Sequence, residues 1–282
     1  MWVGFQLIRI KNLLLISISQ VFIVCLLYSY AQLSFTVFLY IICTFCLAAA
    51  GNIINDYFDI TTDQINKPNK QIVSKIISAK NSFLLYIVFN TLGLLFGTFA
   101  CYYLQNIALF CYGIFSILLL YIYSKKAKGI PFLGNFLIAS LTGFSILFFL
   151  LIIPSNKYQT QTIYALSYFA FILNLIREVV KDIEDVKGDK KAKLNTLPIA
   201  IGTKYTVLLC KFLMGITFSS LLIVLYLSNS IYLKIFISFF LIIPLAYCYQ
   251  QLKFPYKKNQ ISKISRILKL IIACGILAVF FT

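Results

Sequence analysis

Apolar runs long enough to cross a lipid bilayer recur along the whole chain of 282 residues. A transmembrane helix needs about 20 mostly apolar residues, and inside a bilayer only helices and closed barrels pair all their backbone polar groups. The predicted fold class is therefore all-α, a polytopic membrane bundle of about nine transmembrane helices. We expect the spans at residues 13–31, 35–55, 82–104, 106–123, 132–153, 162–180, 205–227, 232–251 and 267–282.

The chain contains no Pro/Ser-rich linker or low-complexity segment that would divide it. Its composition is 61% hydrophobic, well above that of an ordinary soluble domain. We therefore predict a single integral-membrane domain over residues 1–282.

Basic residues collect in every second connection between these spans. Arg9 and Lys11 precede the first span, and lysines crowd four later segments. These segments lie near residues 56–81, 124–131, 181–204 and 252–266. The other connections offer little beyond Lys157 and Lys234. Since loops rich in lysine and arginine stay in the cytoplasm, we predict a multi-pass protein of the cell inner membrane with a cytoplasmic N-terminus.

The net charge of +17 is explained largely by this orientation and by attraction to anionic lipid headgroups. Nucleic-acid binding is the other explanation for so basic a chain, but a chain with many spans makes it a poor one. The chain has no histidine, which excludes histidine-based acid–base catalysis. Cys43 and Cys46 form a CxxC inside an apolar span, so helix packing is favoured over zinc or redox chemistry.

All eight acidic residues fall in two short windows. The first acidic window holds Asp56, Asp59 and Asp63, and the second holds Glu178, Asp182, Glu184, Asp185 and Asp189. Three aspartates in each window repeat at the same spacing, in steps of three and then four residues. On a helix these steps place all three carboxylates on one face. Two such faces at one pocket would form an anionic oxygen site of the kind that Mg²⁺ prefers, which indicates chemistry on a diphosphate.

A simpler interpretation of each window is a solvated cytoplasmic loop whose acids pair with nearby lysines. Two copies of one triad, with no acid elsewhere in the chain, favour a functional site instead. Arg177 and Lys181 lie one turn apart beside the second window, where they can contact phosphate oxygens or balance the carboxylates. Glu184 points away from the aspartate face, and we expect it to be a solvated partner of a lysine.

The two windows also indicate a weak internal symmetry. Each follows the end of an even-numbered span, and each is followed by a basic cytoplasmic stretch and another pair of spans. Asn52 lies four residues before Asp56, as Glu178 lies four before Asp182. We therefore expect a bundle of two pseudo-related halves whose acidic faces meet near its cytoplasmic mouth.

Several segments together resemble the UbiA-type intramembrane prenyltransferases. The NDxxDxxxD of residues 55–63, followed by NKP, is similar to the first signature of that family, and the DxxDxxxD of residues 182–189 is similar to the second. The run YSKKAKGIPFLGN at 123–135 resembles the connection between the family's fourth and fifth helices. Arg9 and Asn12 match an Arg and an Asn at the start of its first helix. The resemblance extends from the first helix to at least the seventh.

Within that family the run REVVKDIEDVKGDKKAKLNTLP at 177–198 is most similar to the branch of digeranylgeranylglyceryl phosphate synthases. The chain departs from this branch after Pro68, where Lys70-Gln-Ile-Val-Ser-Lys75 replaces the usual Arg-Pro-Ile-Pro-Ser-Gly. The resemblance implies Mg²⁺-dependent transfer of a prenyl group, geranylgeranyl in this branch, from its diphosphate to a lipophilic acceptor. The acceptor implied is geranylgeranylglyceryl phosphate, and in other branches it is an aromatic ring of a quinone precursor.

The resemblance also implies roles for individual residues. The metal ligands would be Asn55, Asp56, Asp59, Asp63, Asp182, Asp185 and Asp189. The groups closest to the reaction would be Asp59, Asp185, Lys128, Arg177 and Tyr123, with Tyr123 shielding an allylic cation. Substrate contacts would come from Arg9, Asn12, Asn52, Asn55, Lys67, Lys181 and Asn135.

Two other classes of protein remain as alternatives. Intramembrane acids bind the transported ion in cation-coupled secondary transporters, but such sites lie at the bilayer midplane, and both windows here adjoin basic cytoplasmic loops. A membrane scaffold without activity would leave the paired triads without a purpose. The expected partners are thus a prenyl diphosphate, a lipophilic acceptor and membrane lipid, with an active site that opens to the cytoplasm and no particular oligomeric state indicated.

Overall fold

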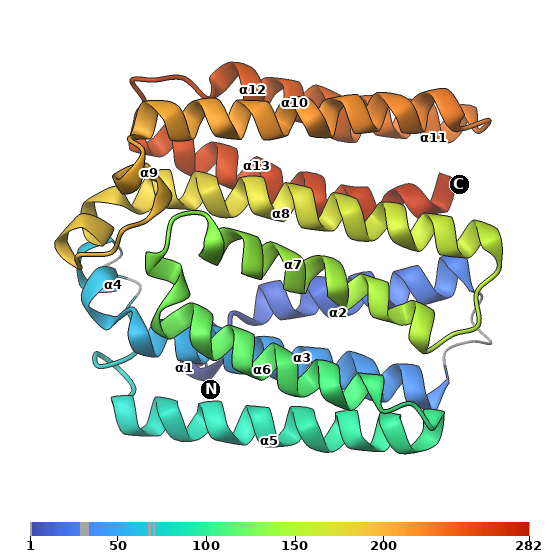
Figure 1. Cartoon of the computed structure of the whole chain (residues 1–282), viewed down its shortest axis with the longest axis horizontal. Coiled ribbons are helices and arrows are strands. Elements are labelled where there is room, and N and C mark those ends of the chain that lie inside the picture. Colours follow the sequence, from blue (N-terminus) through green and yellow to red (C-terminus); the bar gives the residue numbers. More distant parts are fainter. Residues whose placement is uncertain (1, 29–33, 67–68, 70, 282) are drawn as a thin grey trace. The chain divides into compact units, whose positions relative to one another are not determined.

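The computed structural model describes residues 2–28, 34–66, 69 and 71–281, and within them the chain is built from helices (Figure 1). Nine helical segments in this described part are long and apolar enough to cross a membrane, which confirms the all-α class and the expected number of spans. The helices are α1 (Trp2–Leu7), α2 (Ile10–Leu27), α3 (Phe35–Phe58), α4 (Ile60–Asn66), α5 (Ala79–Leu104), α6 (Ala108–Lys125), α7 (Leu133–Leu147), α8 (Lys157–Lys191), α9 (Leu197–Ala200), α10 (Thr203–Leu227), α11 (Ile231–Ile237), α12 (Ile243–Gln251) and α13 (Lys258–Leu277).

Several short turns extend or connect these helices. A 3₁₀ turn, η2, follows α6 at Ala127–Gly129, and others extend α7 over Phe148–Leu151 and α13 over Ala278–Phe281. A π-helical turn, Ser238–Ile242, joins α11 to α12 so that the two form one span. The spans are therefore α2, α3, α5, α6, α7 with its turn, α8, α10, α11–α12 and α13 with its turn.

The helices group into two compact units. The first comprises Met1–Lys128, Phe148–Thr160 and Lys187–Lys193, and the second comprises Gly129–Leu147, Gln161–Val186 and Leu194–Thr282. In the first unit α3 is the central helix, with α5 and α6 running beside it (Figure 1). Its buried face, which includes Ile53 and Ile54, packs against Leu7, Leu13 and Tyr86. This central position of α3 fixes the place of the first acidic window at its end.

The second unit has its own apolar core, around α8, α10, α12 and α13. Val179 and Ile183 of α8 are buried with Met214 of α10, Leu245 of α12 and Leu268 of α13. Apolar side chains also cover much of its outer surface, and Tyr226 is 85% exposed. Such exposure would be an association surface in water, whereas lipid tails solvate it in a membrane.

The structure corrects the extents of two predicted spans. We expected a span over residues 162–180, but α8 runs from Lys157 to Lys191, so one continuous helix carries both this span and the second acidic window, which we expected to be helical. We expected the last span at 267–282, but α13 begins at Lys258 in a stretch predicted to be a loop. In both cases polar residues mark the exit from the bilayer, and they are also good helix formers that continue the helix. Residues 29–31 of the first expected span lie outside the described residues.

Two glycines on α5 let it approach α3 closely. Gly93 and Gly97 lie one turn apart, as in the small-residue interfaces common between membrane helices. A Cβ added at Gly93 would lie 2.7 Å from Leu47 Cδ2 and 3.0 Å from Leu47 Cγ, and Leu47 is itself buried. The α3–α5 contact therefore depends on the absence of a side chain at Gly93.

We expect Gly93→Ala to destabilise the protein by about 1–3 kcal/mol, the usual cost of overpacking, because Leu47 cannot move without disturbing its neighbours. Gly113→Ala on α6 is the matched control, since its Cβ would meet Leu94 Cδ2 at an ordinary 3.6 Å. Thermal unfolding in detergent measures both variants. Shortening the opposing side chain in Gly93→Ala/Leu47→Ala should recover part of the loss. Equal unfolding temperatures for the two alanine variants would contradict this account of the contact.

Candidate active site

The first acidic window lies where α3 passes into α4. Asp56 is in the last turn of α3, Asp59 is the residue between the two helices, and Asp63 is on α4. We expected one continuous helix, and the break at Asp59 is slight: the Asp59 N–H still donates to the Asn55 carbonyl (2.9 Å), and the Asp63 N–H donates to the Asp59 carbonyl (2.8 Å). The spacing of the carboxylates therefore stays close to that of a helix.

Asp59 is the most enclosed carboxylate of this window, with 6% of its surface exposed. Asn55 Nδ2 donates to Asp59 Oδ2 at 2.8 Å, and Lys128 Nζ from η2 contacts the same oxygen. An ionised carboxylate out of water is stable only with such compensation. The structure thus brings together Asn55, Asp59 and Lys128, all three predicted as site residues, although Lys128 is 69 residues from Asp59 in sequence.

Asp56 pairs with Arg9 at the start of the chain. Arg9 Nη2 lies 2.5 Å from Asp56 Oδ1. Burial would lower the pKa of Arg9, but the hydrogen-bonded Asp56 and the other carboxylates of the first window outweigh it, so that pKa is raised above its usual value. Arg9 therefore stays charged at any physiological pH.

The α1–α2 turn holds Arg9 in this position. Arg9 has a left-handed backbone (φ 56°), and the Asn12 N–H donates to its carbonyl at 2.8 Å. Asn52 Nδ2 of α3 donates to the Ile8 carbonyl at 2.9 Å, which fastens the turn to α3. Asn52, predicted as a substrate contact, thus helps to position the arginine, whereas the bond from Asn12 comes from its backbone.

The second acidic window lies along α8. Asn135 Nδ2, near the start of α7, donates to Asp182 Oδ2 at 2.9 Å. Asp185 is half-buried, and Asp189, in the Lys187–Lys193 segment of the first unit, is buried. Asn135 and Asp182 were predicted from separate motifs, and the structure brings them into direct contact.

Arg177 and Lys181 surround Glu178, which is 7% exposed. Arg177 Nη1 lies 3.0 Å from Glu178 Oε1, and Lys181 Nζ lies 2.8 Å from Glu178 Oε2. Of the two roles considered for these cations, charge balance is the one that this geometry displays. Asn52 and Glu178 occupy equivalent positions before the two windows but differ in role, since Asn52 bonds a backbone carbonyl.

The α12–α13 connection is attached to α8 beside the second window. Ser262 Oγ donates to Glu184 Oε1 at 2.5 Å, and the Tyr256 hydroxyl donates to the Ile183 carbonyl at 3.3 Å. We expected Glu184 to be a solvated partner of a lysine, and its partner is instead this serine of α13. Ser262 and Tyr256 were not predicted, because residues 252–266 were expected to be a loop. The helical spacing of Ile261, Ile264 and Leu268 could have revealed Ser262, whereas Tyr256 lies before the helix begins.

For the remaining predicted residues, the structure gives a position on a helix but no side-chain contact used here, or does not describe the residue. Tyr123 is half-buried near the end of α6, and Asp63 lies in the first turn of α4. Lys67 lies outside the described residues. In the described part of the chain, no three acidic or cysteine side chains are grouped so that they alone could hold a metal ion.

We expect Lys128→Met to destabilise the protein by about 1–3 kcal/mol, because it leaves the enclosed Asp59 carboxylate without its cation; partial exposure of the lysine keeps the loss below that of a fully buried pair. Lys126→Met, at an exposed lysine of the same connection, is the control. Removing the carboxylate charge as well, in Asp59→Asn/Lys128→Met, should restore most of the stability. Unfolding temperatures in detergent test this, and a double variant no more stable than Lys128→Met would refute it.

Comparison with known proteins identifies the family. The UbiA prenyltransferase family matches residues 17–272. Digeranylgeranylglyceryl phosphate synthase of Methanosphaera stadtmanae is 35% identical over 219 residues, covering 75% of this chain and 74% of that protein. The enzyme of the same name from Methanococcus maripaludis is 32% identical over 269 residues, covering 95% and 92%.

Solved structures agree with this result. A structure of digeranylgeranylglyceryl phosphate synthase aligns with a TM-score of 0.71 at 30% identity, over 99% of this chain and 96% of that one. A UbiA homologue from Archaeoglobus fulgidus bound to DMAPP and Mg²⁺ shares the fold, with a TM-score of 0.68 at 19% identity over 98% of both chains. The chain therefore belongs to the UbiA prenyltransferase family of integral-membrane proteins.

Proposed function

We propose that this protein is a Mg²⁺-dependent prenyltransferase that transfers a geranylgeranyl group from geranylgeranyl diphosphate to geranylgeranylglyceryl phosphate. The main support for this proposal is the pair of identically spaced aspartate triads in a member of this family. Two relatives reported above are named digeranylgeranylglyceryl phosphate synthase, after the product of this reaction. The proposal treats residues 1–282 as one working domain.

The donor set suits magnesium. The side chains of both windows offer carboxylate and amide oxygens, which are hard ligands. Mg²⁺ is usually held by one or two carboxylates together with substrate phosphates, so a ready-made cluster of three protein carboxylates is not required. The proposed ligands are Asn55, Asp56, Asp59, Asp63, Asp182, Asp185 and Asp189. When bound, Mg²⁺ supplies Lewis-acid neutralisation of the charge that gathers on the departing diphosphate.

The cations beside the windows are the proposed phosphate ligands. Lys128 and Arg9 already face carboxylates of the first window, and a bound diphosphate offers them a second set of anionic oxygens. Arg177, Lys181 and Lys67 complete this proposed set, with arginine able to bind two oxygens at once. Asn12, Asn52 and Asn135 are further proposed substrate contacts, and the side chains of Asn52 and Asn135 also hold neighbouring groups through hydrogen bonds. Charge developing on the leaving group is thereby met by preorganised donors.

The proposed reaction breaks the bond between the allylic carbon and the diphosphate oxygen, leaving an allylic cation. That cation must be shielded from water until the acceptor attacks. Tyr123, half-buried on α6, has an aromatic face suited to this task. The free hydroxyl of the acceptor then forms the new carbon–oxygen bond and releases its proton. Since the chain has no histidine, a carboxylate or the released diphosphate is the proposed proton acceptor.

Neutralising Asp59 or Asp185, by Asp59→Asn or Asp185→Asn, should lower the rate by at least about 100-fold, as expected when groups that stabilise transition-state charge are removed. Glu184→Gln is the matched control, because this acid lies beside Asp185 but bonds Ser262 and should keep most of the activity. The assay is incorporation of radiolabelled geranylgeranyl diphosphate into geranylgeranylglyceryl phosphate in nanodiscs, with and without EDTA.

EDTA should abolish turnover, and added Mg²⁺ should restore it. Product with an aromatic acceptor alone would keep the prenyl-transfer chemistry and overturn the proposed acceptor. Activity in both aspartate variants equal to that of Glu184→Gln would overturn the proposed site, and absence of turnover by the folded wild-type protein with any acceptor would point to ion transport.

The proposed orientation has a cytoplasmic N-terminus in the cell inner membrane, with the active site opening to the cytoplasm. Lysines concentrate near one set of helix ends, and Lys157 belongs to the sparse opposite set. A membrane-impermeant maleimide added to intact spheroplasts should label Lys157→Cys but should label Lys257→Cys only after permeabilisation. Both lysines are exposed, and the unmutated chain controls for its eight cysteines. The reverse labelling pattern would invert the proposed topology.

A further inference from the structure

Lys211 lies inside an apolar span of the second unit. It is eight residues from Thr203, where α10 begins (211 − 203), or about 12 Å along the helix at 1.5 Å per residue. It is half-buried and lies on the flank of α10, beside the buried face that carries Cys210 and Met214. Charged side chains inside membrane spans are costly, and they usually mark a site at which a partner meets the charge. Lys211 therefore requires a partner that stabilises its ammonium group.

The protein offers Lys211 an aromatic ring but no carboxylate. Lys211 Nζ lies 4.8 Å from the centroid of the Tyr249 ring on α12, within the range at which a ring face attracts a cation. All eight acids belong to the two acidic windows, and Lys211 forms no ion pair with any described residue. An ammonium group has three N–H donors, and the ring supplies no oxygen for them. The charge of Lys211 is thus matched to an anion that the chain itself does not supply.

The ammonium group of Lys211 lies closer to the membrane surface than its backbone does. α10 begins and α12 ends at the same end of the second unit (Figure 1), and Tyr249 is two residues before Gln251, where α12 ends (251 − 249). Since Lys211 contacts that ring, its side chain extends toward the helix ends. Lysines commonly lay the apolar stem along the helix in this way and keep the charge at headgroup level. The exposed Lys204 and Lys253 lie at the same end, so an anion there meets a positive surface.

The same flank of α10 has room for an alkyl chain next to the ammonium group. Gly215 lies one turn beyond Lys211, toward the interior of the membrane, and a Cβ added to it would meet nothing within 4 Å. Leu222, about three turns beyond Lys211 on that flank, is 46% exposed. A positive group at headgroup level, with an open apolar strip behind it, matches the two parts of a membrane lipid: an anionic phosphate and an alkyl chain.

We propose that Lys211 and Tyr249 bind the phosphate of an anionic membrane lipid whose alkyl chain lies along α10 over Gly215. The Tyr249 hydroxyl has no hydrogen-bond partner among the described residues, so it is available to donate to a phosphate oxygen. Basic sites between membrane helices bind lipid headgroups in this manner. A soluble phosphate would gain nothing from the apolar strip, which favours a lipid. Neither residue belongs to the proposed catalytic site, so the inference is independent of the proposed reaction.

The proposal predicts that an anionic lipid stabilises the protein through Lys211. Phosphatidylglycerol added to delipidated protein in detergent should raise the unfolding temperature, as a ligand of the folded state does. Phosphatidylcholine should raise it less, because its headgroup carries a cation of its own. Lys211→Met should weaken the apparent affinity for phosphatidylglycerol about fivefold, as expected for the loss of one lysine near an anionic headgroup. Without added lipid this variant should unfold no earlier than the wild type, because the substitution removes a charge from an apolar span.

Lys263→Met is the matched control. Lys263 Nζ also lies over a tyrosine ring, 5.1 Å from the centroid of Tyr247, but it is exposed and already donates to the Tyr247 hydroxyl at 2.7 Å. This variant should keep the affinity of the wild type. Equal losses in the two variants would mean that only net charge matters, and equal stabilisation of the wild type by the two lipids would mean that the headgroup charge is not recognised. Either result would overturn the proposal.

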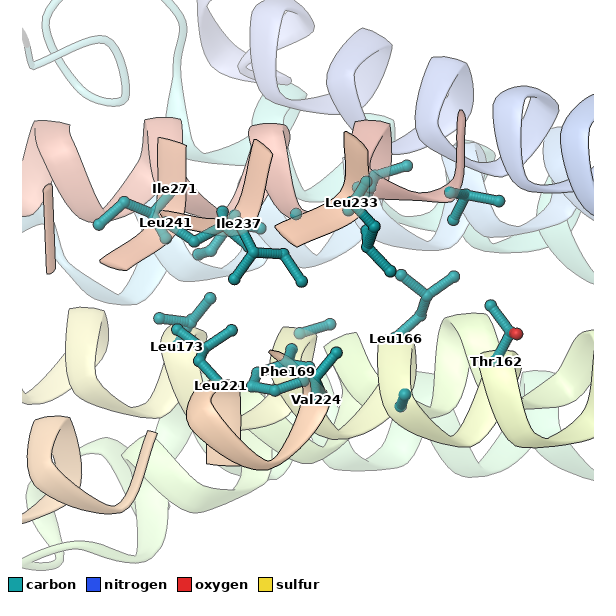
Figure 2. Close-up of a pocket in the computed structure, with 17 residues that line it drawn as sticks. Thr162, Leu166, Phe169, Leu173, Leu221, Val224, Leu233, Ile237, Leu241 and Ile271 are labelled. Atoms are coloured by element: carbon teal, nitrogen blue, oxygen red, sulfur yellow. The ribbon is translucent and has the colours of Figure 1, made fainter. Parts of the chain in front are cut away.

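The alkyl chain is tested by closing the space at Gly215. Gly215→Leu should also weaken phosphatidylglycerol binding. Gly275→Leu on α13 should not, although a Cβ there likewise meets nothing within 4 Å. Gly275 instead lines an apolar cavity of about 100 Å³, which Phe169 and Leu173 of α8 also line (Figure 2) and to which neither Lys211 nor Gly215 contributes. Equal affinities in the two glycine variants would contradict the proposed path of the chain.

Photolabelling locates the headgroup directly. A phosphatidylglycerol analogue with a diazirine in its headgroup should label α10 or α12 near Lys211 in the wild type and in Lys263→Met, and this labelling should be lost in Lys211→Met. Excess inorganic phosphate should leave the labelling intact. Displacement by phosphate alone would assign the site to a soluble anion, and labelling of the wild type only at other segments would remove the site altogether.

Discussion

The compensation of buried carboxylates is the interaction on which the rest of this structure depends. Ionised acids at the edge of hydrocarbon are tolerated only when cations or strong donors meet them. Asp59 is compensated by Asn55, one turn earlier in α3, and by Lys128, 69 residues away in sequence. The long-range pair therefore fastens the connection after α6 to the end of α3. Glu178 is satisfied locally instead, by Arg177 and Lys181 on α8.

The same pairs make chemical sense in a prenyltransferase. A cation held against a carboxylate is already desolvated and oriented, so under the proposed function a diphosphate would meet donors that need little reorganisation. Arg9 is the clearest case, because nearby carboxylates raise its pKa and the Asn52–Ile8 hydrogen bond fixes the turn that carries it. The cations that we propose to bind the diphosphate near the first window are thus also groups that stabilise the fold.

The sequence revealed the spans and the acidic windows because both depend on local composition. Hydrophobic runs predict spans, and aspartates at three- and four-residue steps predict one helical face. Helix ends were predicted less well at α8 and α13, since polarity marks the membrane boundary and lysines and acids still favour helix. Most hydrogen-bond partners could not be predicted from the sequence. Nothing in the local sequence links Asn52 to the Ile8 carbonyl or Ser262 to Glu184, because those contacts arise only from tertiary packing.

Helix α8 passes through two chemically different environments, one acidic and one apolar. Its second half carries every acid of the second window, whereas its first half presents Phe169 and Leu173 to an apolar cavity. A helix is rigid and has a fixed rise, so the distance between polar and apolar ends is set by residue number alone. The two groups also face opposite sides of α8, because the nine residues from Leu173 to Asp182 make two and a half turns. Substitutions around the cavity therefore leave the charged groups untouched, since these lie about 13 Å or more away on the other face of the helix.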